Sequence, residues 1–319
     1  MNSITRKLVL SVLTVVLTVI ALGTTTFAWF TLTNTSVIQP FEAQVVSDTG
    51  IEVAVGAVGS DPIADLVWKT VITTQDIYDY IELTYDAPNI NNPDGIREFR
   101  FTHVTTPDGV NFYDLNGLST TSGYLEIPLH FRSDNEQKIM WEAVTLSSTP
   151  ASYLTGVTFT DSSNTLRTAG GNFPANLADA MKISVTGIVN RGTTTSGTTA
   201  FENPAGGTNT YSGGFVNKDL RTNAGDGVPP YIGANGAQNF YYQSTNTLPS
   251  GSESVNTVAT LTSLPADQLV LDMASGQVLT ADAEYYGYVV VRVWFEGWDA
   301  EGYNALLGRM ISISLRFGV

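Results

Sequence analysis

Few residues of this chain have the types and spacing that catalysis requires. Cysteine is absent, which excludes a thiolate nucleophile, a disulfide and a cysteine-bound metal. The two histidines, His103 and His130, are far apart, and neither belongs to a His-Glu-x-x-His zinc pair. The chain also has no Gly-x-Ser-x-Gly nucleophile elbow and no Gly-x-x-x-x-Gly-Lys phosphate loop. We therefore predict that the protein is not an enzyme and that it has no cofactor.

Carboxylates are the remaining groups that are able to bind a cation. Glu296, Asp299 and Glu301 lie close together before the last apolar stretch. They suit either a cation site or a solvated acidic loop, and we favour the loop. The segment 89–95 is rich in Asn and contains Asp94, but it lacks the Asp-x-Asp-x-Asp-Gly spacing and the distal Glu of a calcium loop. It is expected to form a turn, and no metal site is predicted.

Two cationic residues, Arg132 and Lys182, stand in otherwise apolar stretches of this acidic protein. The simplest explanation is that each pairs with Glu or Asp across a sheet. His130 falls on the outward face of its expected strand, where a solvated side chain is favoured over a metal ligand.

Aromatic residues gather near the C-terminus. Tyr288 and Trp294 share one face of an expected strand with Arg292, opposite a row of valines. Aromatic surfaces bind glycans and partner proteins, but such residues also cover the outside of a sheet with a second layer. We favour the second interpretation for these residues and their neighbours, which are Tyr285, Tyr286 and Trp298.

The elements that position these side chains are predicted to be β-strands. Apolar and polar residues alternate in short runs, which is typical of strands with one buried face. Pro128 cannot donate a ladder hydrogen bond, so its strand is expected at a sheet edge or at a bulge. The expected strands are 41–46, 51–55, 67–73, 78–85, 99–104, 124–132, 139–146, 157–160, 181–189, 288–295 and 310–317.

Helix signals in the body of the chain are few. Residues 176–180 and 76–80 are expected to form short helical connectors. Between about 190 and 255 the sequence is rich in Gly, Thr and Asn, which predicts long loops or an irregular hairpin. Aromatic residues within that stretch indicate an excursion that folds back onto the main body. The fold class predicted is all-β, a two-sheet β-sandwich with an N-terminal hydrophobic signal or anchor helix.

The N-terminus has the pattern of an export signal. Arg6 and Lys7 precede an apolar run over 8–22, so the chain that follows is expected outside the cell membrane. The run is short for a spanning helix unless 24–30 is added. Thr26 and Ala28 are suitably small for cleavage by an export signal peptidase between Ala28 and Trp29. We favour cleavage, which gives a signal peptide at 1–28 and a sandwich domain at 29–319. The alternative is an uncleaved membrane anchor.

Charge excludes a further class of partner. Lys and Arg total 15 against 30 Asp and Glu, for a formal net charge of −15. Removal of the signal takes away Arg6 and Lys7 and no acidic residue, so the exported chain is more negative still. Such a surface repels phosphate backbones, and nucleic acid is not expected as a partner.

The segment from Gly23 to Phe30, with a small residue next to an aromatic one, resembles the SipW-type signal peptides of the TasA and camelysin group of exported bacterial proteins. In that group Asp often follows the aromatic residue, whereas Thr31 stands here. Three further stretches, 129–133, 178–185 and 293–299, are similar to sequence in bacterial surface proteins with such signals. The resemblance implies a jelly-roll-like sandwich on the cell surface or in a biofilm matrix.

In the fibre-forming members of that group, the N-terminal segment is thought to complete the sheet of a neighbouring subunit. The corresponding residues here would be Trp29, Phe30, Leu32, Val37, Ile38 and Phe41. The segment 41–46 is equally suited to be the first strand of its own sandwich, and we favour that assignment. We predict a non-enzymatic extracellular structural protein that forms a homo-oligomer or fibre by β-strand addition. The alternatives are a membrane-anchored adhesin, an envelope or coat protein of a membrane-associated virus, and last a peptidase of the camelysin type.

Overall fold

A computed structural model of the chain describes part of its sequence. The described residues are 36–37, 45–46, 50–58, 66–85, 99–114, 117–163, 165–189, 194–202, 236–246, 268–273, 285–297, 299, 301–303, 306 and 309–319. The contacts divide the chain into Met1–Asn34 and Thr35–Val319, and every described residue belongs to the second unit. The predicted signal segment, its cleavage site and the turn at 89–95 lie outside the described residues.

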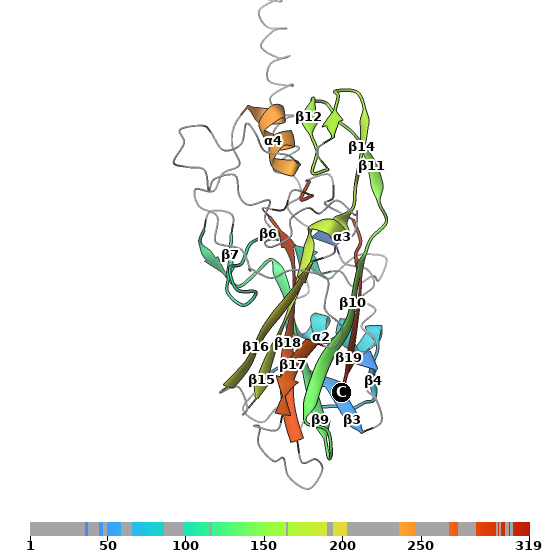
Figure 1. Ribbon diagram of the computed structural model, residues 1–319, viewed down its shortest axis with the longest axis vertical. Helices are drawn as coiled ribbons and strands as arrows, with labels where there is room; N and C mark the ends of the chain where they lie inside the picture. The colour runs from blue at the N-terminus through green and yellow to red at the C-terminus, as the bar shows by residue number, and fades with distance from the viewer. Residues whose placement is uncertain are drawn as a thin grey trace, which may run out of the picture. The chain divides into compact units, whose positions relative to one another are not determined.

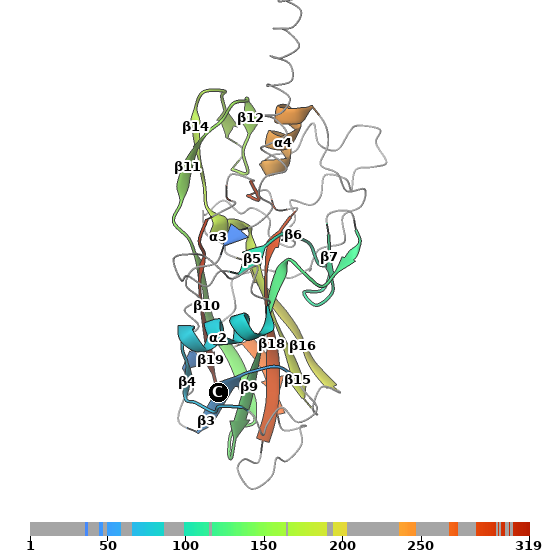
Figure 2. The same cartoon turned by 180° about the vertical axis from the view of Figure 1, so that it is seen from behind.

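The largest sheet has six strands. Its order is β16 (Thr194–Glu202), β15 (Met181–Val189), β18 (Tyr285–Glu296), β9 (Tyr124–Ser133) and β3 (Ile51–Val55), all antiparallel to their neighbours. The sixth strand, β6 (His103–Val104), runs parallel to the end of β18. The long central strands are visible in Figure 1 and from behind in Figure 2.

A second sheet contains β17 (Gln268–Asp272), β10 (Lys138–Ser147) and β19 (Ser312–Gly318), in that order. One apolar core joins the two sheets, because it takes Ile183 and Val291 from the large sheet and Leu271 and Ile313 from the small one. Trp141 on β10 is fully buried, and its ring lies 6.4 Å from that of Phe201 on β16. The fold is therefore all-β in its described part, as predicted, with several antiparallel sheets and few helices.

Five short two-stranded sheets complete the β structure among the described residues. They are β1 (Ser36–Val37) with β5 (Arg100–Phe101), β2 (Val45–Val46) with β4 (Val71–Ile72), β7 (Phe112–Tyr113) with β8 (Ser119–Thr120), β11 (Ala151–Leu154) with β14 (Asn172–Ala175), and β12 (Phe159–Thr160) with β13 (Leu166–Arg167).

The strand predicted over 78–85 is wrong, because these residues belong to the helix α2 (Thr74–Thr84) apart from Tyr85, its C-cap. Thr73 accepts a hydrogen bond from the backbone of Asp76, whose carboxylate accepts one from Thr73, and this capping box starts the helix. Ile77, Tyr80 and Ile81 then follow at helical spacing and are buried on one face. The alternation of period two that suggested a strand was too short to outweigh this pattern.

Two other helices occur in the described residues. The helix α3 (Leu177–Ala180) leads directly into β15 and confirms the connector predicted at 176–180. The helix α4 (Ala237–Thr245) lies within the Gly-rich excursion and packs Phe240 against the core. No helix among the described residues is both long and apolar enough to cross a membrane.

The excursion also contains β16, whose bounds the sequence did not predict; it forms an irregular hairpin with β15, one of the two structures expected for this stretch. Its residues 194–202 are mostly Thr, Ser and Gly, so the composition indicated loops or an irregular hairpin. It pairs with β15 from Lys182 opposite Glu202 to Val189 opposite Thr194. Phe201 and the α4 residue Phe240 both pack on the core, so the described parts of the excursion fold back onto the sheets as expected.

The prediction of an edge strand at Pro128 is also wrong, because β9 lies between β18 and β3. The last β3 residue, Val55, pairs with Leu129, and the next residue, Gly56, donates its N–H to the carbonyl of Pro128 at 3.4 Å. The N and C=O of a strand residue face the same side. The nitrogen of Pro128, which carries no hydrogen, therefore faces the end of β3. Pro128 cannot return a hydrogen bond to the Gly56 carbonyl, which instead lies 3.0 Å from Nε2 of His130.

Substitution of Trp141 by Ala should remove one of the largest fully buried side chains among the described residues. We expect the free energy of unfolding to fall by about 3–5 kcal/mol, because a fully buried Trp leaves a cavity that the sheets cannot close. Urea denaturation followed by circular dichroism measures the change. Leu83→Ala on α2 is the control, since Leu83 is 88% exposed and should change stability by less than about 0.5 kcal/mol.

Candidate functional site: a buried lysine among carboxyl groups

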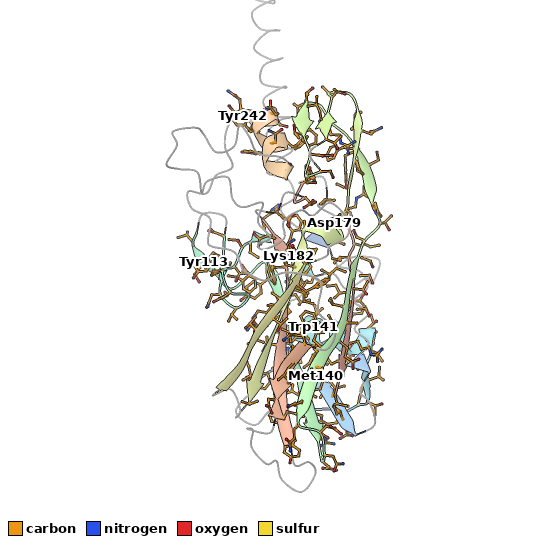
Figure 3. The ribbon with its side chains drawn as sticks, viewed as in Figure 1. Tyr113, Met140, Trp141, Asp179, Lys182 and Tyr242 are labelled. Atoms are coloured by element: carbon orange, nitrogen blue, oxygen red, sulfur yellow. The ribbon has the colours of Figure 1, made fainter. Side chains whose placement is uncertain are left out.

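The most unusual chemical group in the described structure is the ammonium of Lys182, which is 0% exposed. Lys182 is the second residue of β15, and α3 places Asp179 one turn before it. Glu202 ends the neighbouring strand β16, and Asp299 and Glu301 belong to the connection after β18. These five residues are called the Lys182 cluster, and Figure 3 shows Asp179 and Lys182 side by side at the end of β15.

The ammonium makes two ion pairs. Its Nζ lies 2.5 Å from Oδ2 of Asp299 and donates a hydrogen bond of 2.9 Å to Oε2 of Glu202. It also donates a hydrogen bond, at 3.3 Å, to the backbone carbonyl of Asp179. Because these acceptors come from distant parts of the sequence, one cation joins α3, β16 and the connection after β18.

The side chain of Lys182 lies on the outer face of the six-stranded sheet. Its strand neighbours Met181 and Ile183 point into the core between the sheets, so Lys182 points the other way. Lys182 is directly opposite Glu202 on one side and opposite Trp294 of β18 on the other. The cross-strand pairing predicted for this lysine is therefore confirmed, and it occurs in a fully buried position.

The connection after β18 is folded tightly over this position. Asp299 and Gly302 donate backbone hydrogen bonds to the carbonyls of Glu296 and Asp299, at 3.3 and 3.0 Å. A Cβ added to Gly302 would lie only 3.0 Å from the Asp299 carbonyl and 3.3 Å from that of Glu296, so the close turn requires glycine. The backbone N–H of Glu301 donates to Oδ1 of Asp299 at 2.8 Å, which fixes the carboxylate toward the lysine.

Burial and mutual repulsion control the proton affinities of the cluster. Desolvation, followed by the charge of Asp299, raises the pKa of Asp179 to about 7. Desolvation, the charge of Asp299 and a hydrogen bond to that carboxyl raise the pKa of Glu301 to about 10. Burial acts against the charged form of Lys182, but Asp299 and Glu202 outweigh it and raise the pKa of the ammonium. At neutral pH the cluster therefore contains a cation, at least one carboxylate and a protonated Glu301.

Four aromatic rings pack together beside Glu301, at one side of the Lys182 cluster. The ring of Tyr303 lies 5.0 Å from that of Phe173 and 6.1 Å from those of Phe159 and Phe240. These rings come from β14, β12 and α4, and Phe159 and Phe173 are buried. They keep water from one side of the carboxyl groups, which strengthens every charge interaction inside.

The solvated acidic loop predicted for Glu296, Asp299 and Glu301 is wrong. Their side chains are 0%, 1% and 8% exposed. Glu296 accepts a hydrogen bond of 3.0 Å from the indole of Trp294, and the other two belong to the Lys182 cluster. In the part of the chain that the structure describes, no group of three His, Cys, Asp or Glu side chains is arranged to hold a metal.

The prediction of a solvated His130 is wrong as well. It does point to the outer face of β9, but it is 0% exposed, because residues 56 and 68 cover that face. Its Nδ1 is 2.8 Å from the Tyr286 hydroxyl and its Nε2 is 3.0 Å from the Gly56 carbonyl. Desolvation lowers the pKa of His130 to about 4, so the ring is neutral and both nitrogens have partners.

The C-terminal aromatic residues cover the sheet, as favoured from the sequence. Tyr286, Tyr288 and Trp294 are 1%, 3% and 0% exposed. Trp68 packs on the two tyrosines, and Phe112 of β7 packs edge-on against Trp294 at 5.3 Å. These three residues therefore form no accessible aromatic surface; Trp298 lies outside the described residues.

The other predicted cation also pairs across the sheet. Arg132 Nε donates to Glu52 at 2.6 Å, and the two residues are directly opposite each other on β9 and β3. Arg292 makes a third such pair with Glu126 at 2.8 Å and also donates to Thr186. Lys182 and Arg132 stood out as charges in apolar stretches, but the partner of Lys182 could not be named, because Glu202 ends a stretch that was expected to form loops or an irregular hairpin.

Of the six residues predicted to contact another subunit, the structure describes only the backbone of Val37. It pairs with Arg100 of β5 in the same chain. Trp29, Phe30, Leu32, Ile38 and Phe41 lie outside the described residues, as does the cleavage site at Ala28.

The chain matches no known protein-family model, no curated protein and no solved structure.

The raised pKa of Glu301 predicts how stability depends on pH. In the unfolded chain this carboxyl loses its proton near pH 4.5, whereas in the folded protein it keeps the proton up to about pH 10. The folded state therefore binds one more proton above neutrality, and the free energy of unfolding should fall as pH rises, by about 1.4 kcal/mol per pH unit. Urea denaturation at pH 7, 8 and 9 measures the slope.

Glu301→Gln cannot titrate and should remove most of that slope. Glu82→Gln, at an exposed position on α2, is the control and should keep the wild-type slope. Equal slopes in all three proteins would show that Glu301 is ionised in the folded state.

Proposed function

We propose that this chain is a non-enzymatic structural protein of the bacterial cell surface or extracellular matrix, built as a jelly-roll-like β-sandwich and assembled by exchange of its N-terminal segment. The export pattern at 1–30 supports the compartment. The antiparallel sheets support a structural role. The observation that carries assembly is the short pairing of the N-terminal segment with the rest of the chain within the described residues.

That attachment consists of two very short ladders among the described residues. Ser36 and Val37 pair with Phe101 and Arg100, and Val45 and Val46 pair with Ile72 and Val71. Each ladder has two residues on each strand, whereas the β15–β18 ladder pairs eight. Among the described residues, release of the segment breaks only the backbone pairing of these two ladders.

The acceptor side of each ladder belongs to the core. Phe101 is 1% exposed and packs edge-on against Phe99, and Ile72 is also 1% exposed. When the N-terminal segment of one copy takes the place of the same segment in another, every residue pair is kept and only the chain that supplies it changes. A row of such exchanges makes a fibre, because each copy both gives and accepts a strand.

The adhesin alternative loses Tyr286, Tyr288 and Trp294 as a binding surface, since they are buried, but it keeps the Gly-rich excursion at about 190–255 as a second candidate surface. A membrane anchor at the N-terminus remains compatible with assembly on a cell surface. N-terminal sequencing of the exported protein separates the two forms, because a start at Trp29 indicates a released subunit and a retained Met1 an anchor.

Cysteine pairs test the exchange directly, because the chain has no cysteine of its own. Val37 and Arg100 are directly opposite each other, and such pairs have Cα separations within the range of a disulfide. A mixture of Val37→Cys and Arg100→Cys proteins, assembled together and oxidised, should give a covalent heterodimer on a non-reducing gel. The double variant should give a ladder of multimers.

Glu52→Cys and Arg132→Cys provide the control, since these residues are opposite each other within the large sheet and should cross-link only inside one chain. A double Val37/Arg100 variant that forms only an intrachain disulfide, together with a mixture that gives no heterodimer, would contradict the exchange.

A further inference from the structure

The contact between Lys182 and Asp299 holds an amine and a carboxyl group together in a buried site. The amine nitrogen is 2.5 Å from a carboxyl oxygen, and the side chains are 0% and 1% exposed. We propose that Lys182 and Asp299 condense to an intramolecular amide, with Glu301 as the acid–base group, so that a covalent cross-link joins β15 to the connection after β18. This inference stands independently of the proposed function.

The short contact and the burial of both side chains favour amide formation. A nitrogen in contact with a carboxyl oxygen is within about 3–3.5 Å of the carboxyl carbon, the separation from which attack proceeds. In water the ammonium and carboxylate are well solvated, and condensation is unfavourable. In the buried site the resting pair is a cation beside a carboxylate, and the reactive form is the minor one, in which a proton has passed from the nitrogen to Oδ2 across the 2.5 Å contact and left a neutral amine beside a carboxylic acid.

The atoms balance without any other reagent. The bond that forms joins Lys182 Nζ to Cγ of Asp299, and the bond that breaks is one of the two C–O bonds of that carboxyl group. The oxygen leaves as water with two of the three ammonium protons, and the nitrogen keeps the third. No oxidation or reduction takes place.

Glu301 is placed to relay those protons. Its carboxyl group is hydrogen-bonded to that of Asp299, and its backbone N–H holds Oδ1 of the same residue at 2.8 Å. Its Oε2 is buried without a hydrogen-bond partner. The raised pKa keeps a proton on Glu301 at neutral pH, so that it donates to the leaving oxygen and recovers a proton from the nitrogen.

Glu202 is the competing carboxyl group, and its position suits a different role. It is 2.9 Å from the nitrogen and lies directly opposite Lys182 in the β15–β16 ladder. No contact places Glu301 beside it. We assign Glu202 as a positioning residue that orients the amine toward Asp299.

Intact-mass measurement of the exported protein tests the proposal, once a peptide map has fixed its N-terminus. The wild-type chain should be lighter than its sequence by one water molecule, and digestion should give a branched peptide that joins Lys182 to Asp299. The Lys182→Arg variant keeps the positive charge but should have the mass calculated from its sequence, with no loss of water. Asp299→Asn should lose ammonia in place of water, which identifies the acyl partner.

Glu301→Gln should greatly slow the condensation and leave most of the protein at full mass, with near-ultraviolet circular dichroism used to show that the variant is folded. Lys69 and Asp76 provide an internal control, because their atoms are also 2.5 Å apart but their side chains are 39% and 17% exposed. A branched peptide at that pair would show that burial is not the cause.

Folded wild-type protein at full mass with an unbranched Lys182 peptide would overturn the proposal. A branched peptide that joins Lys182 to Glu202 would overturn the choice of Asp299. Because the first of these measurements uses the unaltered chain, failure of a variant to fold leaves the proposal testable.

Discussion

A buried lysine constrains one whole end of this structure, as an ammonium when the chain folds and as an amide in the condensed form proposed above. Lys182 has no access to water, so its charge is tolerable only if the carboxyl groups around it are held in place. Those groups come from α3, from the end of β16 and from the connection after β18. Each of these segments would leave an unpaired buried charge if it moved away, which makes their positions interdependent.

The same constraint fixes strand register. A slip of one residue in β15 would turn Lys182 into the apolar core and separate it from Glu202, which is directly opposite. The apolar core alone specifies β16 poorly, since Thr, Ser and Gly make up most of that strand. The two faces of the large sheet therefore have different roles. The inner face supplies apolar burial around Trp141, and the outer face supplies ion pairs that select one arrangement.

The long strands could be predicted from the sequence because they carry their own pattern. The alternation around Ile127, Ile183 and Ile313 identified β9, β15 and β19 with only small errors at their ends. Only the part of α2 at 76–80 was expected to be helical, because the apolar spacing of 78–85 also fits a β pattern. The bounds of β16 were not predicted because its stability comes from β15 and the core and not from its own residues.

The ion pairs of the site could be predicted from the sequence, but the burial of the surrounding residues could not. Lys182 and Arg132 stood out as charges within apolar runs, and pairing was the correct expectation for both. The burial of Asp299, Glu301 and His130 depends on what covers the outer face of the sheet. Those covering residues are distant in sequence and carry no local signal. An acidic loop and an outward histidine were therefore assigned to water.

Hydrogen exchange tests the central claim that the Lys182 cluster holds this end of the structure together. Comparison of wild-type and Lys182→Met protein at neutral pH should show lost protection in 196–202 and 296–303, while β9 and β10 stay protected. Protection that is unchanged in all four segments would contradict the account, because it would show that packing alone fixes the strand β16 and the connection after β18.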